Sequence, residues 1–235
     1  MTDRRTRSSP GLLVLSLTSL LLAGGSAYAL LAETGPYLFA GGGLAQRVQT
    51  LANGNLHPGL SRPAHDLVLD DCVQVASSLF GLSLRTDLRT AAVATCAAAA
   101  SGFAQASPVY SYAHYVEALM AAERSDAAEL SRALASARAV APSEQWLAEL
   151  RVKLGEDHLS LLQPIALAGH EADLRLLVMS QRGIRTIARR YAAVESFRGR
   201  ITAIVEKLPM EQQKRFIAAL RNEIASRTPT AAAVR

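Results

Sequence analysis

The sequence predicts an all-α protein that is attached to a membrane by one N-terminal helix. Three observations support this prediction. An uncharged, leucine-rich run lies near the N-terminus, apolar residues further on recur at steps of three and four, and no segment alternates like a strand. Aromatic residues make up only 5% of the chain, which argues against an aromatic-rich β-sandwich or barrel.

The N-terminal segment combines a basic stretch, residues 1–10, with an uncharged apolar one, residues 11–32. About 20 apolar residues cross the hydrocarbon core of a bilayer as a helix, so residues 11–31 are long enough for a transmembrane signal anchor. The basic stretch contains Arg4, Arg5 and Arg7. Because arginines precede the span and none follows closely, we expect a cytoplasmic N-terminus and an exported remainder.

A cleaved signal peptide is the alternative to an anchor. Ala27 and Ala29 flank Tyr28 in the small-x-small pattern of a cleavage site, and cleavage near Ala29 would release the chain. The apolar run continues through Leu31, which favours the anchor. Arginine far outnumbers lysine, which is typical of a GC-rich bacterial genome. We therefore expect a single pass through the inner membrane with the bulk of the chain in the periplasm.

Residues 33–64 are expected to form a linker, since glycine, proline and asparagine cluster there, with one short helix at residues 44–52. Helical spacing begins at residue 65 and continues to about Phe80. A second, alanine-rich helix is predicted from about Thr86 to a break before Pro108.

Three more helices are predicted over residues 109–124, 126–140 and 143–154. Asp126 and Glu129 have the spacing of a capping box at the start of the second of these. The domain assigned to residues 65–160 is therefore a set of antiparallel helical hairpins.

An internal repeat lies within residues 108–155. Pro108 and Pro142 are 34 residues apart, and each is followed at steps of four by an aromatic residue and two aliphatic ones. The aromatic residues are Tyr112 and Trp146. This spacing resembles the tetratricopeptide repeat, which implies a degenerate array of stacked hairpins with a concave surface for a protein ligand. An ordinary antiparallel helix bundle is the alternative.

The C-terminal region, residues 161–227, is predicted to form basic helices. From residue 175 to residue 227 the chain carries twelve lysines and arginines against four glutamates. One apolar stripe runs from Val194 to Leu208, and Pro209 begins a last helix. Residues 228–235 are expected to form a flexible tail.

Cys72 and Cys96 lie about a dozen residues on either side of the turn near Ser83, so an antiparallel hairpin would bring them to the same level. In an oxidising periplasm they are candidates for a disulfide. The alternative is two buried thiols that never pair.

No catalytic motif is present. The sequence contains no G-x-S-x-G elbow, no phosphate-binding Walker loop and no H-E-x-x-H pair, and its five histidines are scattered. We therefore expect no enzyme, no metal site and no cofactor.

The expected function is that of a scaffold or adaptor for protein–protein interaction in a process of the bacterial envelope, such as polysaccharide or protein export. The partner would be another envelope protein. The alternative is a regulatory module in which the C-terminal arginines bind an anionic polysaccharide or lipid. Nucleic acid is not expected, because the chain is exported and poor in aromatic residues. The candidate interaction residues are Tyr112, Tyr115, Trp146, Arg182, Arg185, Arg189 and Arg190. Packing in the core is the alternative for the three aromatic residues, and a solvated charged surface is the alternative for the arginines.

Overall fold

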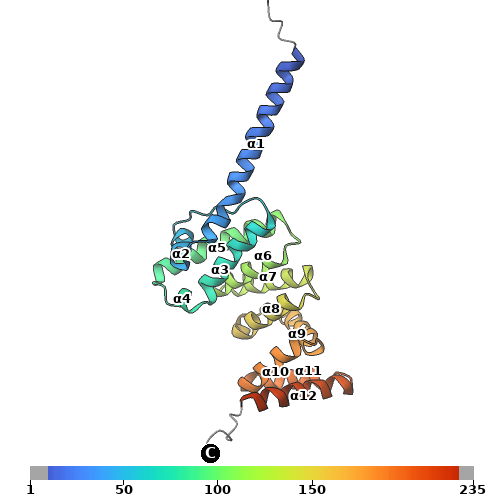
Figure 1. The fold of residues 1–235 in the computed structure, drawn as a ribbon. Helices are drawn as coiled ribbons and strands as arrows, with labels where there is room; N and C mark the ends of the chain where they lie inside the picture. The colour runs from blue at the N-terminus through green and yellow to red at the C-terminus, as the bar shows by residue number, and fades with distance from the viewer. Residues whose placement is uncertain (1–9, 228–235) are drawn as a thin grey trace, which may run out of the picture. The chain divides into compact units, whose positions relative to one another are not determined.

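The computed structural model describes residues 10–227, which contain helices and no strand (Figure 1). The all-α prediction is confirmed for these residues. The basic stretch with Arg4, Arg5 and Arg7, and the tail at residues 228–235, lie outside the described residues. The chain divides into two compact units, unit 1 (residues 1–95) and unit 2 (residues 96–235).

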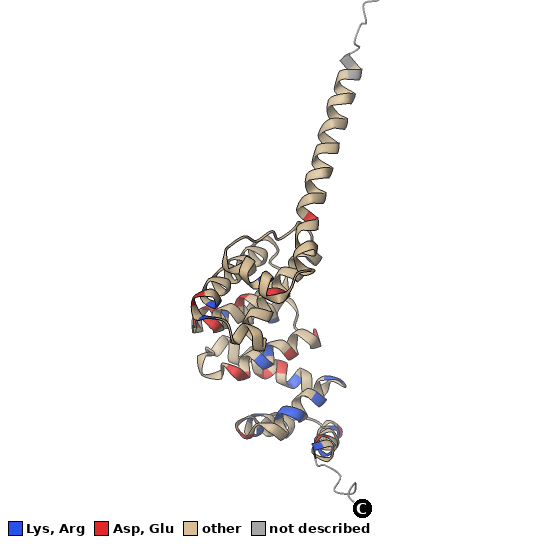
Figure 2. Cartoon of the chain, turned by 60° about the vertical axis from the view of Figure 1, so that its left-hand side comes forward, with Lys and Arg blue, Asp and Glu red and all other residues tan. Residues whose placement is uncertain are grey.

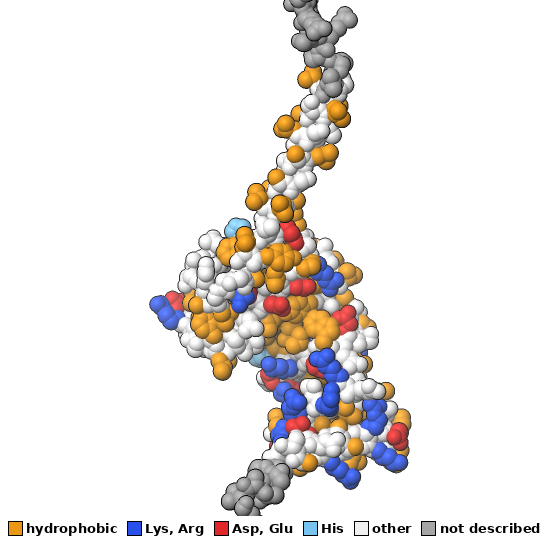
Figure 3. Space-filling model, in the orientation of Figure 1, with side chains coloured by type: hydrophobic (Ala, Val, Ile, Leu, Met, Phe, Trp, Pro, Cys, Tyr) orange, Lys and Arg blue, Asp and Glu red, His pale blue; other side chains and the backbone are white. Residues whose placement is uncertain are grey.

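The N-terminal helix of unit 1, α1, runs from Pro10 to Ala40 (Figure 1). Proline suits the first position of a helix because its φ is already helical and its missing N–H would have no partner there. Leu13–Ala40 is long and apolar enough to cross a membrane, and aliphatic side chains project from it on the face shown in Figure 3. One candidate membrane span is therefore present, as the sequence predicts.

Helix α1 extends further than the sequence indicates. We expected a linker to begin at residue 33, yet α1 continues to Ala40, α2 spans Leu44–Ala52 and α3 spans Arg62–Ser77. Pro36 lies inside the helix without ending it, and this residue is buried in unit 1. Only the turn after α1 and the loop at residues 53–61 lack helical structure here. The short helix predicted at residues 44–52 is confirmed.

The remainder of unit 1 packs on α3. Helices α1, α2 and α4 (Leu79–Leu82) contact α3, and an ion pair of 2.6 Å between Arg47 and Asp71 joins α2 to α3. Gly81 allows the close approach of α4, because a Cβ there would lie 2.2 Å from the carbonyl oxygen of Val75. Helix α5 (Thr86–Ala106) contributes residues to both units.

Unit 2 consists of a series of helices that follow one another with short connections. In chain order they are α6 (Ser111–Glu123), α7 (Ala127–Val140), α8 (Gln145–Asp157), the 3-10 turn η1 (Leu159–Leu161), α9 (Pro164–Met179), α10 (Gly183–Ala193), α11 (Glu195–Val205) and α12 (Met210–Arg227). The predicted cap of α7 is present, since the side chain of Asp126 accepts a hydrogen bond of 3.0 Å from the backbone N–H of Glu129.

The main contacts in unit 2 join each helix to the next helix or the next but one. Helix α6 packs on α7 and α8, α9 packs on α7, α8 and α10, and α12 packs on α10 and α11. A core of fully buried aliphatic and aromatic side chains, including Leu177, Ile187, Phe197 and Ile201, lies among α8 to α12. Neighbouring helices therefore bury most of the predicted apolar stripe from Val194 to Leu208, whereas Ile217 and Ile224 on α12, which were expected to face inward, are exposed.

Candidate functional site

Asp173 of α9 is almost completely buried and is held by two arginines. Its carboxylate accepts hydrogen bonds from Nε and Nη2 of Arg151 on α8, at 2.7 and 2.9 Å, and also pairs with Arg138 on α7. Arg151 is itself 3% exposed. A buried carboxylate needs such partners because burial removes its hydration. The cluster therefore joins α7, α8 and α9.

Glu156 of α8 forms a second buried cluster. It contacts the ring of His170 on α9 at 2.7 Å and pairs with Arg200 on α11. Burial favours the neutral form of Glu156, but the hydrogen bonds from His170 and Arg200 outweigh this and lower the pKa of the carboxyl. Glu156 is therefore an ionised contact between three helices.

Glu117 of α6 forms a third cluster, with Arg132 of α7 at 2.8 Å and His114 at 3.5 Å. Burial opposes ionisation of Glu117, yet His114 and Arg132 lower the pKa of its carboxyl. Hydrogen bonding to Glu117 is the main cause that raises the pKa of His114, whose Nε2 also lies 3.0 Å from the carbonyl oxygen of Pro108. In each of the three clusters the buried carboxylate pairs with side chains of neighbouring helices, so we assign all three to stability, although the long contact between His114 Nδ1 and Glu117 Oε2 leaves both atoms without a well-formed hydrogen bond.

Two ion pairs show that α8 and α10 run parallel. Glu149 lies 3.9 Å from Arg182, and Asp157 lies 2.9 Å from Arg190. The two acids are eight residues apart on α8, and their partners are eight residues apart, in the same order, on the segment that leads into and forms α10. Helix α10 therefore lies beside α8, and it also contacts α12.

A groove of about 380 Å³ lies between α10 and α12. Arg185 and Arg189 line it from α10, and Arg215 lines it from α12. One carboxylate, Glu223, is also present, and it lies 3.9 Å from Arg189 and 2.9 Å from Arg227. Since three arginines line the groove against one acid, it favours an anionic ligand. We refer to these residues as the arginine groove. Figure 2 colours the positions of Lys and Arg along the chain blue.

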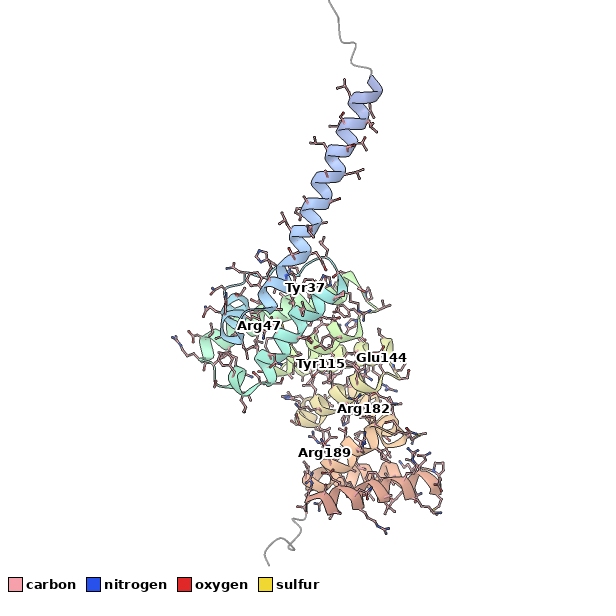
Figure 4. All side chains as sticks on the ribbon, in the orientation of Figure 1. Tyr37, Arg47, Tyr115, Glu144, Arg182 and Arg189 are labelled. Carbon is pink, nitrogen blue, oxygen red and sulfur yellow. The ribbon has the colours of Figure 1, made fainter. Side chains whose placement is uncertain are left out.

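The expected arginines differ in availability. Arg182, Arg185 and Arg189 are exposed, and Figure 4 labels the first and last of them. Arg190 is engaged, because its guanidinium stacks over the ring of Phe197 at 5.6 Å and pairs with Asp157.

Sequence reasoning missed Arg215 as a candidate. It shares one face of α12 with Ala218, Ala219 and Asn222, a spacing of three to seven residues that was visible in the sequence. What the spacing does not give is the partner helix that this face meets.

The aromatic candidates are mostly interior. Tyr112 and Tyr115 are buried and stack with ring centroids 6.1 Å apart, and burial raises the pKa of the Tyr115 phenol to about 12 (Figure 4). Trp146 packs on Tyr112 at 5.6 Å but remains 47% exposed. Of the three expected anchors, therefore, only Trp146 offers a large surface to a partner.

The expected concave surface is not open along α6. Every residue of α6 from Ser111 to Ala122 is buried. A helix that is covered on all sides serves as core, so the exposed surface of unit 2 must come from other helices.

Both cysteines are buried, Cys72 on α3 and Cys96 on α5, and each is disulfide-bonded and not a free thiol. Within residues 10–227, no three His, Cys, Asp or Glu side chains are grouped so that they could hold a metal ion.

Comparison with protein-family models, with curated proteins and with solved structures finds no match to this chain. The residues and their geometry alone carry the functional interpretation.

Proposed function

We propose that this protein is a membrane-anchored helical scaffold of the bacterial periplasm, which binds another envelope protein without a catalytic step of its own. Helix α1 supplies the anchor, since Leu13–Ala40 is long and apolar enough to span a bilayer. The arginines before it favour a cytoplasmic N-terminus and an exported body.

The helices of unit 2 support a tetratricopeptide-like array. Helices α6 and α8 have the same length of 13 residues and start 34 residues apart, at Ser111 and Gln145. Helix α6 contacts α8, α7 contacts α9, and α8 runs parallel to α10, which is how equivalent helices of successive hairpins pack. The insertion of η1 before α9 delays the next repeat, so the array is degenerate.

The observation that carries the proposal is that α10 lies beside α8 and also contacts α12. Trp146 lies one helical turn before Glu149, whose partner Arg182 leads into the arginine groove. Tryptophan and arginine contribute more to protein–protein binding than other residue types. We name this region, from Trp146 to the arginine groove, the binding surface, and its arginines favour an acidic segment of the partner.

A photo-crosslinking experiment in native membranes tests the proposal. A benzophenone amino acid replaces Arg189 on the binding surface, or Ile165 on α9 as an exposed control. We expect one defined adduct from position 189 that is lost when Arg215→Glu reverses the charge of the groove, and none from position 165. The same adduct from both positions would refute the binding surface.

Fusion of alkaline phosphatase after Arg235 tests the location separately. We expect an active enzyme, because this reporter folds only after export. A fusion that is inactive, paired with a β-galactosidase fusion that is active, would place the body in the cytoplasm and overturn the anchor.

The arginine groove also favours a second candidate function, the binding of an anionic polysaccharide or lipid headgroup. Three guanidinium groups around one groove suit a polyanion as well as an acidic peptide. Ionic strength separates the two functions. Binding of alginate, as a probe polyanion, would fall steeply with added salt, whereas a contact that includes Trp146 would persist.

A further inference from the structure

Four large apolar side chains are exposed where α1 enters the folded part of unit 1. Tyr37, Leu38 and Phe39 lie in the last turn of α1, and Leu60 lies in the loop before α3 (Figure 4 labels Tyr37). Leu38 is 77% exposed and Leu60 is 58% exposed. We refer to these four residues as the collar. Large apolar side chains that gather on a water-facing surface usually mark a binding site.

The loop that carries Leu60 is fixed against α1. The carboxylate of Glu33 accepts hydrogen bonds from the backbone N–H groups of Leu60, at 2.8 Å, and Ser61, at 2.9 Å. The ring of His57 packs 5.7 Å from the ring of Phe39. Residues 57–61 therefore lie beside residues 33–39 of α1, so Leu60 is held next to the end of the candidate span.

The helix rise sets the depth of the collar relative to a bilayer. A hydrocarbon core of about 30 Å takes about 20 residues, so a span that begins near residue 11 ends near Leu31. Leu60 is tied to Glu33 and so lies only about 3 Å beyond that point, at 1.5 Å per residue. Leu38 lies about 10 Å beyond it.

Two effects bring Leu38 closer to the core of the bilayer. Side chains on a helix lean toward its N-terminus, which for α1 is toward the membrane. Tilt of the helix shortens its projection along the bilayer normal. Since the interfacial layer extends roughly 5–8 Å beyond the hydrocarbon on each side, the collar falls within it.

We propose that the collar is embedded in the interfacial layer of the exported leaflet, so that unit 1 sits directly on the lipid surface. The proposal rests on the anchor described under the proposed function. Tyr28, which is exposed on α1 just inside the hydrocarbon boundary, and Tyr37 beyond that boundary suit the tyrosine and tryptophan belt of membrane interfaces. The orientation of unit 1 relative to the membrane then follows from the unbroken helix and from the hydrogen bonds of Glu33.

Another apolar patch in unit 1 serves as the control. Leu79 on α4 is 88% exposed, and α4 lies at the opposite end of unit 1 from the point where α1 enters (Figure 1). If the collar faces lipid, Leu79 faces water. Exposure alone therefore cannot account for a difference between the two patches.

Tryptophan fluorescence in vesicles tests the depth of each site. Trp146 is the only native tryptophan, so Trp146→Phe provides a silent full-length background that keeps a ring beside Tyr112. Single tryptophans then replace Leu21 within the span, Leu38, Leu60 or Leu79. Each variant is reconstituted in phosphatidylethanolamine and phosphatidylglycerol vesicles that contain lipids brominated near the headgroup or near the chain ends.

We expect Leu38→Trp and Leu60→Trp to lose emission with bromine near the headgroup, with a blue-shifted maximum and weak quenching by aqueous acrylamide. Leu79→Trp should show the reverse, and Leu21→Trp should be quenched most by bromine near the chain ends. All four sites are exposed, and circular dichroism verifies that each variant remains helical.

The outcomes separate the two proposals. If Leu21→Trp is quenched by lipid but the collar variants behave like Leu79→Trp, the anchor stands and the collar proposal is overturned. If Leu21→Trp is not quenched by lipid, the anchor fails and the collar proposal fails with it.

Discussion

Replacement of Asp173 by leucine should be among the most destabilising single changes in unit 2. The change leaves Arg151, which is 3% exposed, without the two short hydrogen bonds that hold its guanidinium. Its remaining contact is a long one of 3.5 Å to the carbonyl oxygen of Ala137. Removal of one partner from a buried ion pair costs about 3–5 kcal/mol, because the other charge stays buried.

The magnitude is measured by urea unfolding of the full chain in detergent under non-reducing conditions. Trp146 reports the transition, since it lies on α8 with Arg151. Asp157→Asn is the matched control, because it breaks the pair with Arg190 at a carboxylate that is 46% exposed and should cost at most about 1 kcal/mol. The double variant Arg151→Met with Asp173→Leu should recover most of the loss, since no buried charge remains.

A loss for Asp173→Leu no larger than that of Asp157→Asn would refute the reasoning. So would a double variant that is less stable than Asp173→Leu alone. In either case the stability of unit 2 would not depend on the charge of Arg151.

Three further predictions concern pH, the cysteines and the binding surface. Because Glu117 raises the pKa of His114, protonated His114 stabilises the folded state fully below pH 6.5, the usual histidine value, and this stabilisation is lost as the pH rises through the raised pKa. The pKa of Glu117 is lowered, so ionised Glu117 stabilises the folded state fully above pH 4.5, and this stabilisation is lost as the pH falls through the lowered pKa. His114→Gln should therefore lower the urea midpoint most between these values and least at alkaline pH. We expect Cys72 and Cys96 to be bridged to each other in the exported protein. Alkylation of the unfolded protein without reduction should therefore leave its mass unchanged. Uptake of two alkyl groups would contradict the bridge. Trp146→Ala should weaken partner crosslinking from position 189. Because the side chain is half exposed, the change should lower the free energy of unfolding, followed by circular dichroism, by no more than about 1 kcal/mol, and a much larger loss would assign Trp146 to the core.

The helices could be read from the sequence because their signals are local. The step of three and four residues along α7 and the Asp126 cap at its start both act within a few residues of each other. The same holds for the short helix α2 and for the uncharged run of α1. The helices predicted over residues 44–52, 109–124, 126–140 and 143–154 therefore agree with the structure to within a few residues.

The site could not be read in the same way, because its features depend on which helices meet. From the sequence, Tyr112 and Tyr115 could be anchors for a partner or core residues, and the burial of α6 from Ser111 to Ala122 assigns them to the core. Arg215 becomes a candidate only because α12 lies beside α10, which places it near Arg185 and Arg189. Spacing along one helix defines a face and says nothing about the surface that this face meets.

The end of α1 shows the same difference between what local sequence signals predict and what contacts between distant residues decide. Glycine and proline at residues 35 and 36 predict a break in the helix. In the folded unit the loop at residues 57–61 hydrogen bonds to Glu33, and Pro36 is buried, so the helix persists to Ala40. The amino-acid sequence alone determined the helical class, the candidate membrane span and most helix boundaries, because these depend on interactions between near neighbours. Tertiary structure decided which polar groups are saturated, which aromatic rings are buried and where α1 ends, because these depend on contacts between residues that are distant in the chain.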